Sequence, residues 1–437
     1  MKQVGKKLGI IIFWLLVWQL ISICVNNSIL LVGPWETLRA LCVQACEATF
    51  WKTAVFTTVR ISCGFLLGVT VGFFLALLSK KSKITEAFLE PVMQFFKTVP
   101  VASFVVLFLI WWRADKLAMI ISFMVVMPHI YVNTLEGLKA ADKKLLEMAA
   151  VFEMPVWNKF FYIYRPALKP FLDSGIKVTA GMSWKSGVAA EVIGIPLYSV
   201  GEQLYMSKIN LDTAGVLAWT LVVIFLSAIF EQIVLWVWKK WNAWNPSCVE
   251  KKRLIKEDAK AIVLQDVSKQ YDGKVVLQNV CGTYGKEKIT YLNSPSGSGK
   301  TTMLRVLAGL EKADSGVIAN LNRYLTYVFQ EDRLCEEYNA VKNLELVCGN
   351  SDRARKHLLE LLDEEDLNKP CKALSGGMKR RVAVARAFCV DSEVVLLDEP
   401  FTGLDEENKR RVREYIEKYG TGKVMVIASH GEIEKRI

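Results

Sequence analysis

Long apolar runs fill the first 244 residues of this chain and constrain its fold more than any other feature. A helix that crosses a bilayer needs roughly 20 mostly apolar residues. Six runs approach that length: about 8–26, 54–79, 92–112, 117–135, 170–190 and 213–237. All thirteen Trp, a residue type enriched at membrane–water interfaces, lie between Trp14 and Trp244. We therefore predict an all-α membrane domain of six spans, in contact with lipid, and a different kind of domain after it.

Basic residues indicate how the spans are oriented. With the N-terminus inside, the inner segments hold fourteen Lys and Arg and the outer segments five, which matches the excess of basic residues in cytoplasmic loops. Residues 1–250 carry 23 Lys and Arg against 15 Asp and Glu. Most of the net charge of +11 therefore belongs to the membrane half, and we expect no nucleic-acid partner. The first run lacks a small-residue cleavage site, so we expect a retained span rather than a signal peptide.

Charged residues inside two of the predicted spans depart from the apolar pattern. The fifth span carries Lys177, Lys185 and Glu191, and the second carries Arg60. A charge at the bilayer centre costs about 2.5–3.5 kcal/mol on insertion scales. These side chains therefore either line a polar path or pair with one another and reach the interfaces by snorkelling. The sequence leaves both possibilities open.

Short apolar runs replace the long ones in the last part of the chain. Residues 245–260 are polar and charged, typical of a linker. Beyond them the runs KITYLN, LTYVF, EVVLLD and KVMVIAS alternate with helical stretches, as in an α/β domain with a mainly parallel sheet. The predicted fold class is thus multidomain: a six-span membrane domain (1–244), a linker (245–260) and an α/β domain of the phosphate-loop type (261–437).

The segment SPSGSGKT, residues 294–301, has the pattern of a phosphate loop between a strand and a helix. The usual pattern is G-x-x-x-x-G-K-[ST], and Ser294 replaces its first glycine. Glycines let backbone N–H groups turn toward phosphate, and the helix N-terminus adds its dipole. We expect Lys300 to reach the β- and γ-phosphates of ATP and Thr301 to ligate Mg²⁺. The expected nucleotide contacts of this loop are Ser296, Gly297, Ser298, Gly299, Lys300, Thr301 and Thr302.

A pair of carboxylates ends the apolar run VVLLDEP. A carboxylate at the tip of a buried strand beside a phosphate loop holds Mg²⁺, usually through water. The carboxylate that follows it can polarise the attacking water. We therefore expect Asp398 to be a metal ligand and Glu399 to be the catalytic base.

The stretch LSGGMKRRVAVARAF, residues 374–388, resembles the signature sequence LSGGQ of the ATP-binding cassette (ABC) ATPases. The resemblance implies that Ser375, Gly376 and Gly377 contact ATP held by a second copy of the chain. Met378 stands where the family has Gln, and we expect this change to slow hydrolysis without abolishing it.

Four further residues resemble ABC positions in order and spacing. Tyr271 resembles the aromatic residue that stacks on adenine, and Gln330 resembles the Q-loop glutamine that senses Mg²⁺ and water. Asp405 resembles the D-loop aspartate, and His430 the switch histidine that contacts the γ-phosphate. The chain ends seven residues after His430, which implies a shortened ATPase. By this resemblance the catalytic residues are Glu399, His430, Gln330 and Lys300, and the metal ligands are Thr301, Gln330 and Asp398.

The loop between the fourth and fifth spans resembles the EAA loop of bacterial ABC importer permeases, whose short helix docks on the ATPase beside the Q-loop. Glu147, Ala149 and Pro166 match that loop. Glu153 replaces the glycine that turns between its two helices, and Pro155 can compensate because a residue before proline avoids the helical region. The stretches TTVRISCGFLLGV and SWKSGVAAEVIG further resemble the permease branch for nitrate, sulfonates and taurine.

Together these resemblances imply an importer with permease and ATPase fused in one chain. It sits in the bacterial cytoplasmic membrane, with the ATPase in the cytosol, and imports a small solute, such as nitrate, a sulfonate or taurine. Because each ATP site needs a signature from another copy, the partners implied are a second copy and a separate extracellular solute-binding protein. Three alternatives stay open: an importer of a neutral vitamin precursor, a nucleotide-sensing membrane regulator with impaired hydrolysis, and an exporter.

Overall fold

The computed structural model describes residues 2–251, 253, 261–286, 289–295, 297–321 and 324–429. The chain divides into two compact units that interleave along the sequence. The first unit consists of Met1–Ala140 and Ala167–Trp244, and the second of Ala141–Pro166 and Asn245–Ile437. A segment from the middle of the apolar half, residues 141–166, therefore folds with the α/β part.

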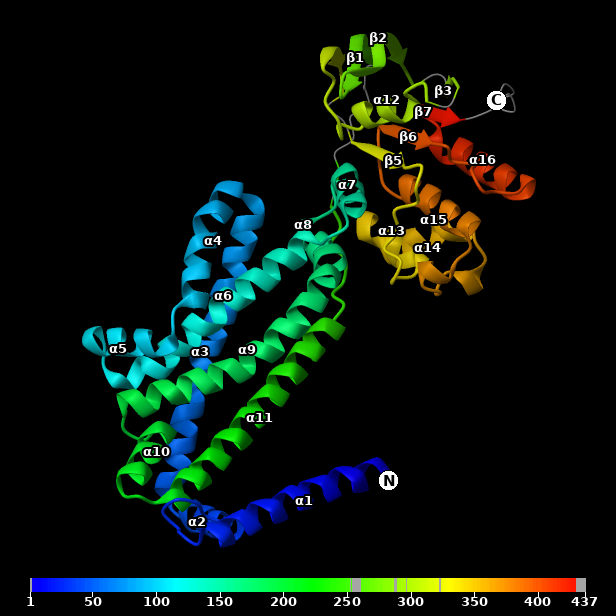
Figure 1. Ribbon diagram of the computed structural model, residues 1–437. Coiled ribbons are helices and arrows are strands. Elements are labelled where there is room, and N and C mark those ends of the chain that lie inside the picture. Colours follow the sequence, from blue (N-terminus) through cyan, green and yellow to red (C-terminus); the bar gives the residue numbers. More distant parts are fainter. Residues whose placement is uncertain are drawn as a thin grey trace. The chain divides into compact units, whose positions relative to one another are not determined.

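All the regular elements among the described residues of the first unit are helices (Figure 1). Its elements are α1 (Lys2–Val25), α2 (Pro34–Ala45), α3 (Ala48–Lys81), α4 (Lys83–Thr98), α5 (Val101–Trp111), a 3-10 turn (Ala114–Lys116), α6 (Leu117–Lys139), α9 (Arg165–Gly194), α10 (Val200–Ile209) and α11 (Thr213–Ala243). Small residues let α3 and α6 approach closely, as is common between membrane helices. A Cβ on Gly64 would lie 2.2 Å from the Met119 carbonyl oxygen, and one on Gly72 would lie 2.5 Å from that of Met127.

Three of the predicted spans are confirmed as helices long and apolar enough to cross a membrane: Ala48–Lys81, Ala114–Lys139 and Thr213–Ala243. The predicted run 92–112 is not one helix, because α4 and α5 meet at a bend of 100°. Val99 precedes Pro100 and is extended (φ −69°, ψ 130°), the conformation that a following proline favours. The runs 8–26 and 170–190 lie in α1, whose apolar part is Gly9–Val25, and in the charged helix α9. The count of six spans stays a prediction.

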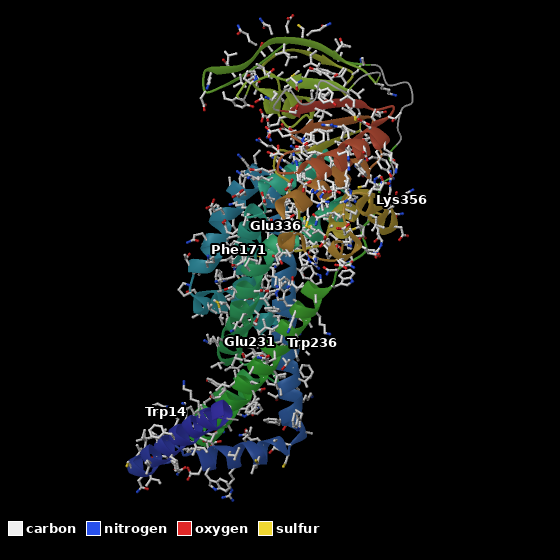
Figure 2. All side chains as sticks on the ribbon, turned by 90° about the vertical axis from the view of Figure 1, so that its right-hand side faces the viewer. Trp14, Phe171, Glu231, Trp236, Glu336 and Lys356 are labelled. Atoms are coloured by element: carbon white, nitrogen blue, oxygen red, sulfur yellow. The ribbon has the colours of Figure 1, made fainter. Side chains whose placement is uncertain are left out.

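The exposed side chains of these helices are mostly apolar. Trp14 on α1 and Trp236 on α11 project away from their helices (Figure 2), and their exposed fractions are 63% and 61%. Large exposed apolar side chains of this kind are stable in contact with lipid. The first unit therefore has the surface of a membrane domain.

The second unit contains two sheets. Strands β1 (Ile262–Tyr271), β2 (Lys274–Tyr284) and β4 (Ser315–Ala319) form an antiparallel sheet in the order β2-β1-β4. Strands β3 (Thr290–Asn293), β7 (Val424–Ser429), β6 (Val394–Asp398) and β5 (Leu325–Val328) form a parallel sheet in the order β3-β7-β6-β5. The four predicted runs KITYLN, LTYVF, EVVLLD and KVMVIAS supply these parallel strands. Every residue of β6 and β7 is buried, which explains their continuous apolar sequence.

Helices cover the parallel sheet. They are α12 (Lys300–Leu307), α13 (Ala340–Cys348), α14 (Ser351–Leu359), α15 (Gly376–Phe388) and α16 (Glu406–Gly420), with 3-10 turns at Glu364–Asp366 and Cys371–Ala373. The segment 141–166 adds α7 (Lys143–Val151), α8 (Val156–Lys159) and a π-helical stretch (Phe160–Tyr164). Met148, Val151 and Phe152 of this segment belong to the same buried apolar cluster as the parallel strands. The segment is thus part of the core of the second unit.

Candidate nucleotide site and its coupling helix

The phosphate loop connects the end of β3 to the first turn of α12. Gly297 and Gly299 have φ values of +82° and +88°, a region that glycine enters without steric cost. A Cβ on Gly299 would lie 2.8 Å from the Val276 carbonyl oxygen, so glycine is needed there for space as well. The loop therefore has the backbone that its sequence predicts. Ser296 lies outside the described residues, and the side chains of Ser298 and Thr302 make no hydrogen bond to other described residues.

Lys300 folds back over this loop. Its Nζ donates to the carbonyl oxygens of Ser294 and Pro295, the latter at 3.2 Å. Ser294 thus contributes its backbone carbonyl, which any residue supplies.

The predicted metal ligands Asp398 and Thr301 lie together at the carboxyl end of β6. Burial raises the pKa of the Asp398 carboxyl even though Thr301 and Tyr327 hydrogen-bond to it, with Tyr327 Oη 3.3 Å from Asp398 Oδ2. No cluster of three or more His, Cys, Asp or Glu suitable for a metal occurs among the described residues. One carboxylate and one hydroxyl still fit Mg²⁺ here, because this ion commonly takes its remaining ligands from phosphates and water.

Glu399 has a strained backbone at the position predicted for the catalytic base. Its φ is +52°, unusual for a residue with a side chain, and such strain is often retained at functional sites. Its N–H donates to the Ala428 carbonyl at 2.8 Å, and its Oε2 accepts from Thr402 Oγ1 at 3.1 Å. Glu399 therefore sits on a turn that its neighbours hold in place.

Arg380, a residue that the sequence analysis missed, connects the parts of the site. It is 3% exposed, and its guanidinium donates to the carbonyl oxygens of Phe329, Gln330, Asp398 and Glu399 and to Asp332 Oδ1, over distances of 2.5–3.4 Å. Arg380 stands in the basic run MKRR at the signature, and this run does not indicate which groups Arg380 binds. Arg386 lies six residues further along α15 and is fully buried. Burial lowers the pKa of its guanidinium to about 10, and this group donates to the carbonyl oxygens of Asp332 and Arg333.

The remaining predicted site residues are those of the signature, Asp405, Gln330, Tyr271 and His430. Ser375 caps α15, its Oγ accepting from Met378 N at 3.3 Å, and Asp405 caps α16, its Oδ1 accepting from Asn408 N at 2.8 Å. Both side chains are exposed, as are Gly376, Gln330 and Tyr271, and Gly377 packs near the Gly403 carbonyl. No hydrogen bond joins Ser375 or Asp405 to the phosphate loop within the described part of the chain. His430 lies outside the described residues.

Helix α7 contacts the nucleotide-binding part of the same unit through Glu147. Arg305 donates from Nη1 and Nη2 to Oε2 and Oε1, each at 3.2 Å, and Arg333 Nη1 donates to Oε2 at 2.7 Å. Burial raises the pKa of the Glu147 carboxyl, but the two guanidinium groups outweigh burial and lower it. Arg305 is on the helix that begins at Lys300, and Arg333 follows Gln330 by three residues. Glu147 therefore touches both elements that the nucleotide would contact.

The turn after α7 keeps a glycine-like backbone although its residue is Glu153. The φ of Glu153 is +44°, and the next N–H, that of Met154, donates to the Ala149 carbonyl at 2.9 Å. Pro155 then precedes α8. The proline does not replace the left-handed turn, as the sequence analysis suggested it could, because both features are present.

The charged residues inside the predicted spans are of two kinds, those that pair with each other and those that are exposed. Arg60 Nη1 lies 3.5 Å from Glu191 Oε1, and Thr57 Oγ1 donates to Glu191 Oε2 at 2.8 Å. These side chains pair with each other. Lys177 and Lys185 are exposed.

Two family models match the chain in separate regions. Residues 68–242 match the inner membrane component of binding-protein-dependent transport systems, and residues 277–402 match the ABC transporter family.

Individual relatives match one half or the other. The sulfate/thiosulfate import ATP-binding protein CysA of Bacillus cereus is 34% identical over 36% of this chain and 50% of its own length. The aliphatic sulfonates import ATP-binding protein SsuB 1 of Pseudomonas savastanoi is 36% identical over 34% of this chain and 64% of its own. A Bacillus subtilis protein named as an aliphatic sulfonates transport permease, SsuC, is 31% identical over 37% and 60%. The chain thus spans about half to two thirds of the length of these relatives.

Solved ATP-binding cassettes match part of the chain. An ATP-binding cassette solved as a dimer in a post-hydrolysis state with ADP and Pi is 26% identical over 39% of this chain and 88% of its own, with a TM-score of 0.36. The permease match includes residues 141–166, the segment that packs into the α/β unit. The chain is thus a membrane protein in which a domain of the binding-protein-dependent permease family is followed by a domain of the ABC transporter ATPase family.

Proposed function

We propose that the chain is one half of an ATP-driven importer of a small anionic solute, such as a sulfonate, sulfate or nitrate, in the bacterial cytoplasmic membrane. The permease part is residues 1–244, the linker 245–260 and the ATPase 261–437. The observation that carries the proposal is Glu147. It lies in the permease-family region, yet its carboxylate is held by Arg305 and Arg333 of the ATPase. A movement of the ATPase elements is thereby passed to the permease sequence.

The residues of the nucleotide site take the roles that their motifs imply. Lys300 exchanges the carbonyls of Ser294 and Pro295 for phosphate oxygens, and Glu399 accepts a proton from the attacking water. Asp398 and Thr301 hold Mg²⁺, which supplies positive charge beside the β- and γ-phosphates. Gln330 and His430 act on the water and the γ-phosphate, and Tyr271 stacks on adenine. Within the described residues Ser375 makes no hydrogen bond to the phosphate loop of its own chain. Together with the resemblance to the ABC signature, this supports a signature that serves the site of a second copy, and thus a homodimer.

The anionic solute class is supported by relatives of both halves that are named for sulfate or sulfonates. A separate solute-binding protein delivers the solute from outside. An importer of a neutral vitamin precursor and a nucleotide-sensing regulator are the alternatives that the experiment must separate.

The test uses the full chain in proteoliposomes with the binding protein encoded nearest to it. ATP hydrolysis and uptake of radiolabelled taurine, sulfate and thiamine are measured for the wild type, Lys300→Ala, Glu399→Gln and Glu147→Ala. We expect Lys300→Ala and Glu399→Gln to lose both activities. We expect Glu147→Ala to lose uptake while it keeps most basal hydrolysis, since the carboxylate touches no nucleotide-binding atom. Uptake by Glu399→Gln at the wild-type rate refutes the assignment, and a wild type that binds but does not hydrolyse ATP favours the regulator.

A further inference from the structure

The exposed face of α9 differs from the exposed faces of the other long membrane helices. α3 exposes Leu66, Phe74 and other large apolar side chains, and α11 exposes Phe225, Ile229 and Ile233. Over its whole length α9 exposes only two large apolar side chains, Val178 and Ile193.

The other exposed positions of α9 are polar or small. They include Ser174, Lys177, Lys185 and Ala189, and beside them Gly181 has no atom within 4 Å of where a Cβ would stand. A face of this composition gains nothing from contact with hydrocarbon.

Lys177 and Lys185 make no ion pair with the other described residues. Glu191 is paired with Arg60 and accepts from Thr57, and Asp173, one turn before Lys177, accepts from Trp238 Nε1 at 2.5 Å. No hydrogen bond or ion pair joins either lysine to another residue that the structure describes. Both ammonium groups therefore need water or an anion.

Position along the helix separates the two lysines. Trp238 stacks on Trp241, with ring centroids 5.0 Å apart, and such tryptophans favour the membrane–water interface, which places Asp173 near that level. At 1.5 Å per residue, Lys177 lies about 6 Å beyond Asp173, within reach of the interface by snorkelling. Lys185 lies about 18 Å beyond Asp173 and about 14 Å before the end of α9 at Gly194. Lys185 thus lies about three turns of helix from Asp173 and more than two turns from the end of α9.

We propose that this face of α9, with Lys177 and Lys185, lines a water-filled path for anions, bounded on its other side by a second copy of the chain. The inference rests on the proposed function for the direction of movement and for the second copy. Lys177, Gly181 and Lys185 are four residues apart, so they lie on one side of α9. The two lysines form successive positive steps along the path, and the absence of a side chain at Gly181 leaves room between them. A cation would be repelled at both steps, so the face selects by charge.

The test measures access of water-soluble thiol reagents to introduced cysteines in full-length protein in vesicles of neutral phosphatidylcholine. Lys185→Cys is compared with Ile229→Cys, a control on the lipid-facing surface of α11. An anionic reagent (sulfonatoethyl methanethiosulfonate) and a cationic one (trimethylammonioethyl methanethiosulfonate) are used, and mass spectrometry of the labelled peptide separates the introduced thiol from the native cysteines. Each rate is divided by the rate of the same reagent with a free thiol.

We expect Lys185→Cys to react at least about 100-fold faster than Ile229→Cys. We expect the normalised rate for the anion to exceed that for the cation by about tenfold, and this ratio to fall to about 1 when Lys177→Met is added. Absence of reaction at position 185 overturns the path, and equal rates for the two reagents overturn its charge selectivity. If Lys185→Cys does not fold, Gly181→Cys, where an added Cβ has no atom within 4 Å, gives the same comparison.

Two further arms separate this inference from its alternatives. Repeating the experiment in vesicles with anionic lipid tests whether the lysines bind a lipid phosphate, in which case the anion preference disappears in those vesicles and the path is refuted. The labelling requires no hydrolysis, so it is repeated in Glu399→Gln. If the wild type shows the anion-selective path but no ATP-driven uptake, the inference stands and the proposed function is refuted; wild-type uptake without labelling at position 185 does the reverse.

Discussion

The substitution Arg380→Met tests how the signature helix holds the catalytic loops. The change keeps an apolar stem of similar length and removes a guanidinium that is 3% exposed and donates to four carbonyl oxygens and Asp332. Removing one partner from a buried charged network typically costs 3–5 kcal/mol, because the groups left behind stay buried without hydrogen bonds. Since 1 kcal/mol shifts the Tm of a domain of 150–250 residues by roughly 2–4 °C, we expect the ATPase unit to melt about 6–20 °C lower.

The matched control is Lys379→Met, one residue earlier on α15. Lys379 pairs with Glu336 at 2.9 Å, but this pair is partly exposed, and such pairs contribute about 0–1 kcal/mol. Thermal unfolding of both variants is followed in detergent by intrinsic fluorescence with ATPase activity measured in parallel. We expect Arg380→Met to lose most activity well below its melting temperature, because the carbonyls of Asp398 and Glu399 lose their common donor. If the two variants melt within about 2 °C of each other and both hydrolyse ATP normally, Arg380 does not organise the site.

Three smaller effects follow from single residues. Glu153→Gly should stabilise the second unit by about 0.5–1 kcal/mol, because glycine removes the strain of a φ of +44° while the larger entropy of the unfolded glycine chain offsets part of that gain. The free energy of unfolding is measured in urea, and a destabilised variant would contradict this. Burial first, and nearby Arg353, lower the pKa of His357 to about 4. Because the pKa of His357 in the folded state is below the unfolded value of about 6.5, its neutral form contributes all of its stability above pH 6.5, and the free energy of unfolding falls by up to about 3 kcal/mol toward pH 4. His357→Gln should remove this loss from the pH profile of stability. Gly201→Ala should prevent stable expression of the membrane unit, because its Cβ would lie 2.3 Å from Glu191, whereas Gly9→Ala, with nothing within 4 Å, should express like the wild type.

Motifs with local geometry could be predicted from the sequence. The phosphate loop, the β6 carboxylates and the strands that flank them follow from short patterns, because glycines with positive φ and strand ends act over a few residues. The helices α3, α6 and α11 follow from their apolar length alone. The run 92–112 was predicted as one span because its apolar composition conceals the effect of Pro100 on the residue before it.

Contacts over long sequence separations could not be predicted. Nothing in the local pattern of MKRR indicates that Arg380 binds the loops that follow β5 and β6, since five acceptors distant in sequence meet only in the folded unit. The sequence likewise did not decide that Arg60 pairs with Glu191 while Lys185 stays exposed. A charged residue in an apolar run looks the same in the sequence whether or not it has an ion-pair partner in the fold.

The amino-acid sequence by itself determined that this chain joins apolar helices to a nucleotide-binding α/β domain, because composition and short motifs depend on neighbouring residues. The resemblance of the 147–166 loop to the EAA loop implied that it docks on the ATPase, but only the tertiary structure decided that residues 141–166 pack into the core beside the ATPase strands and that Glu147 lies between Arg305 and Arg333. The physical reason is that burial of Met148, Val151 and Phe152 and the pairing of one carboxylate with two guanidinium groups depend on surfaces built from residues more than a hundred positions away.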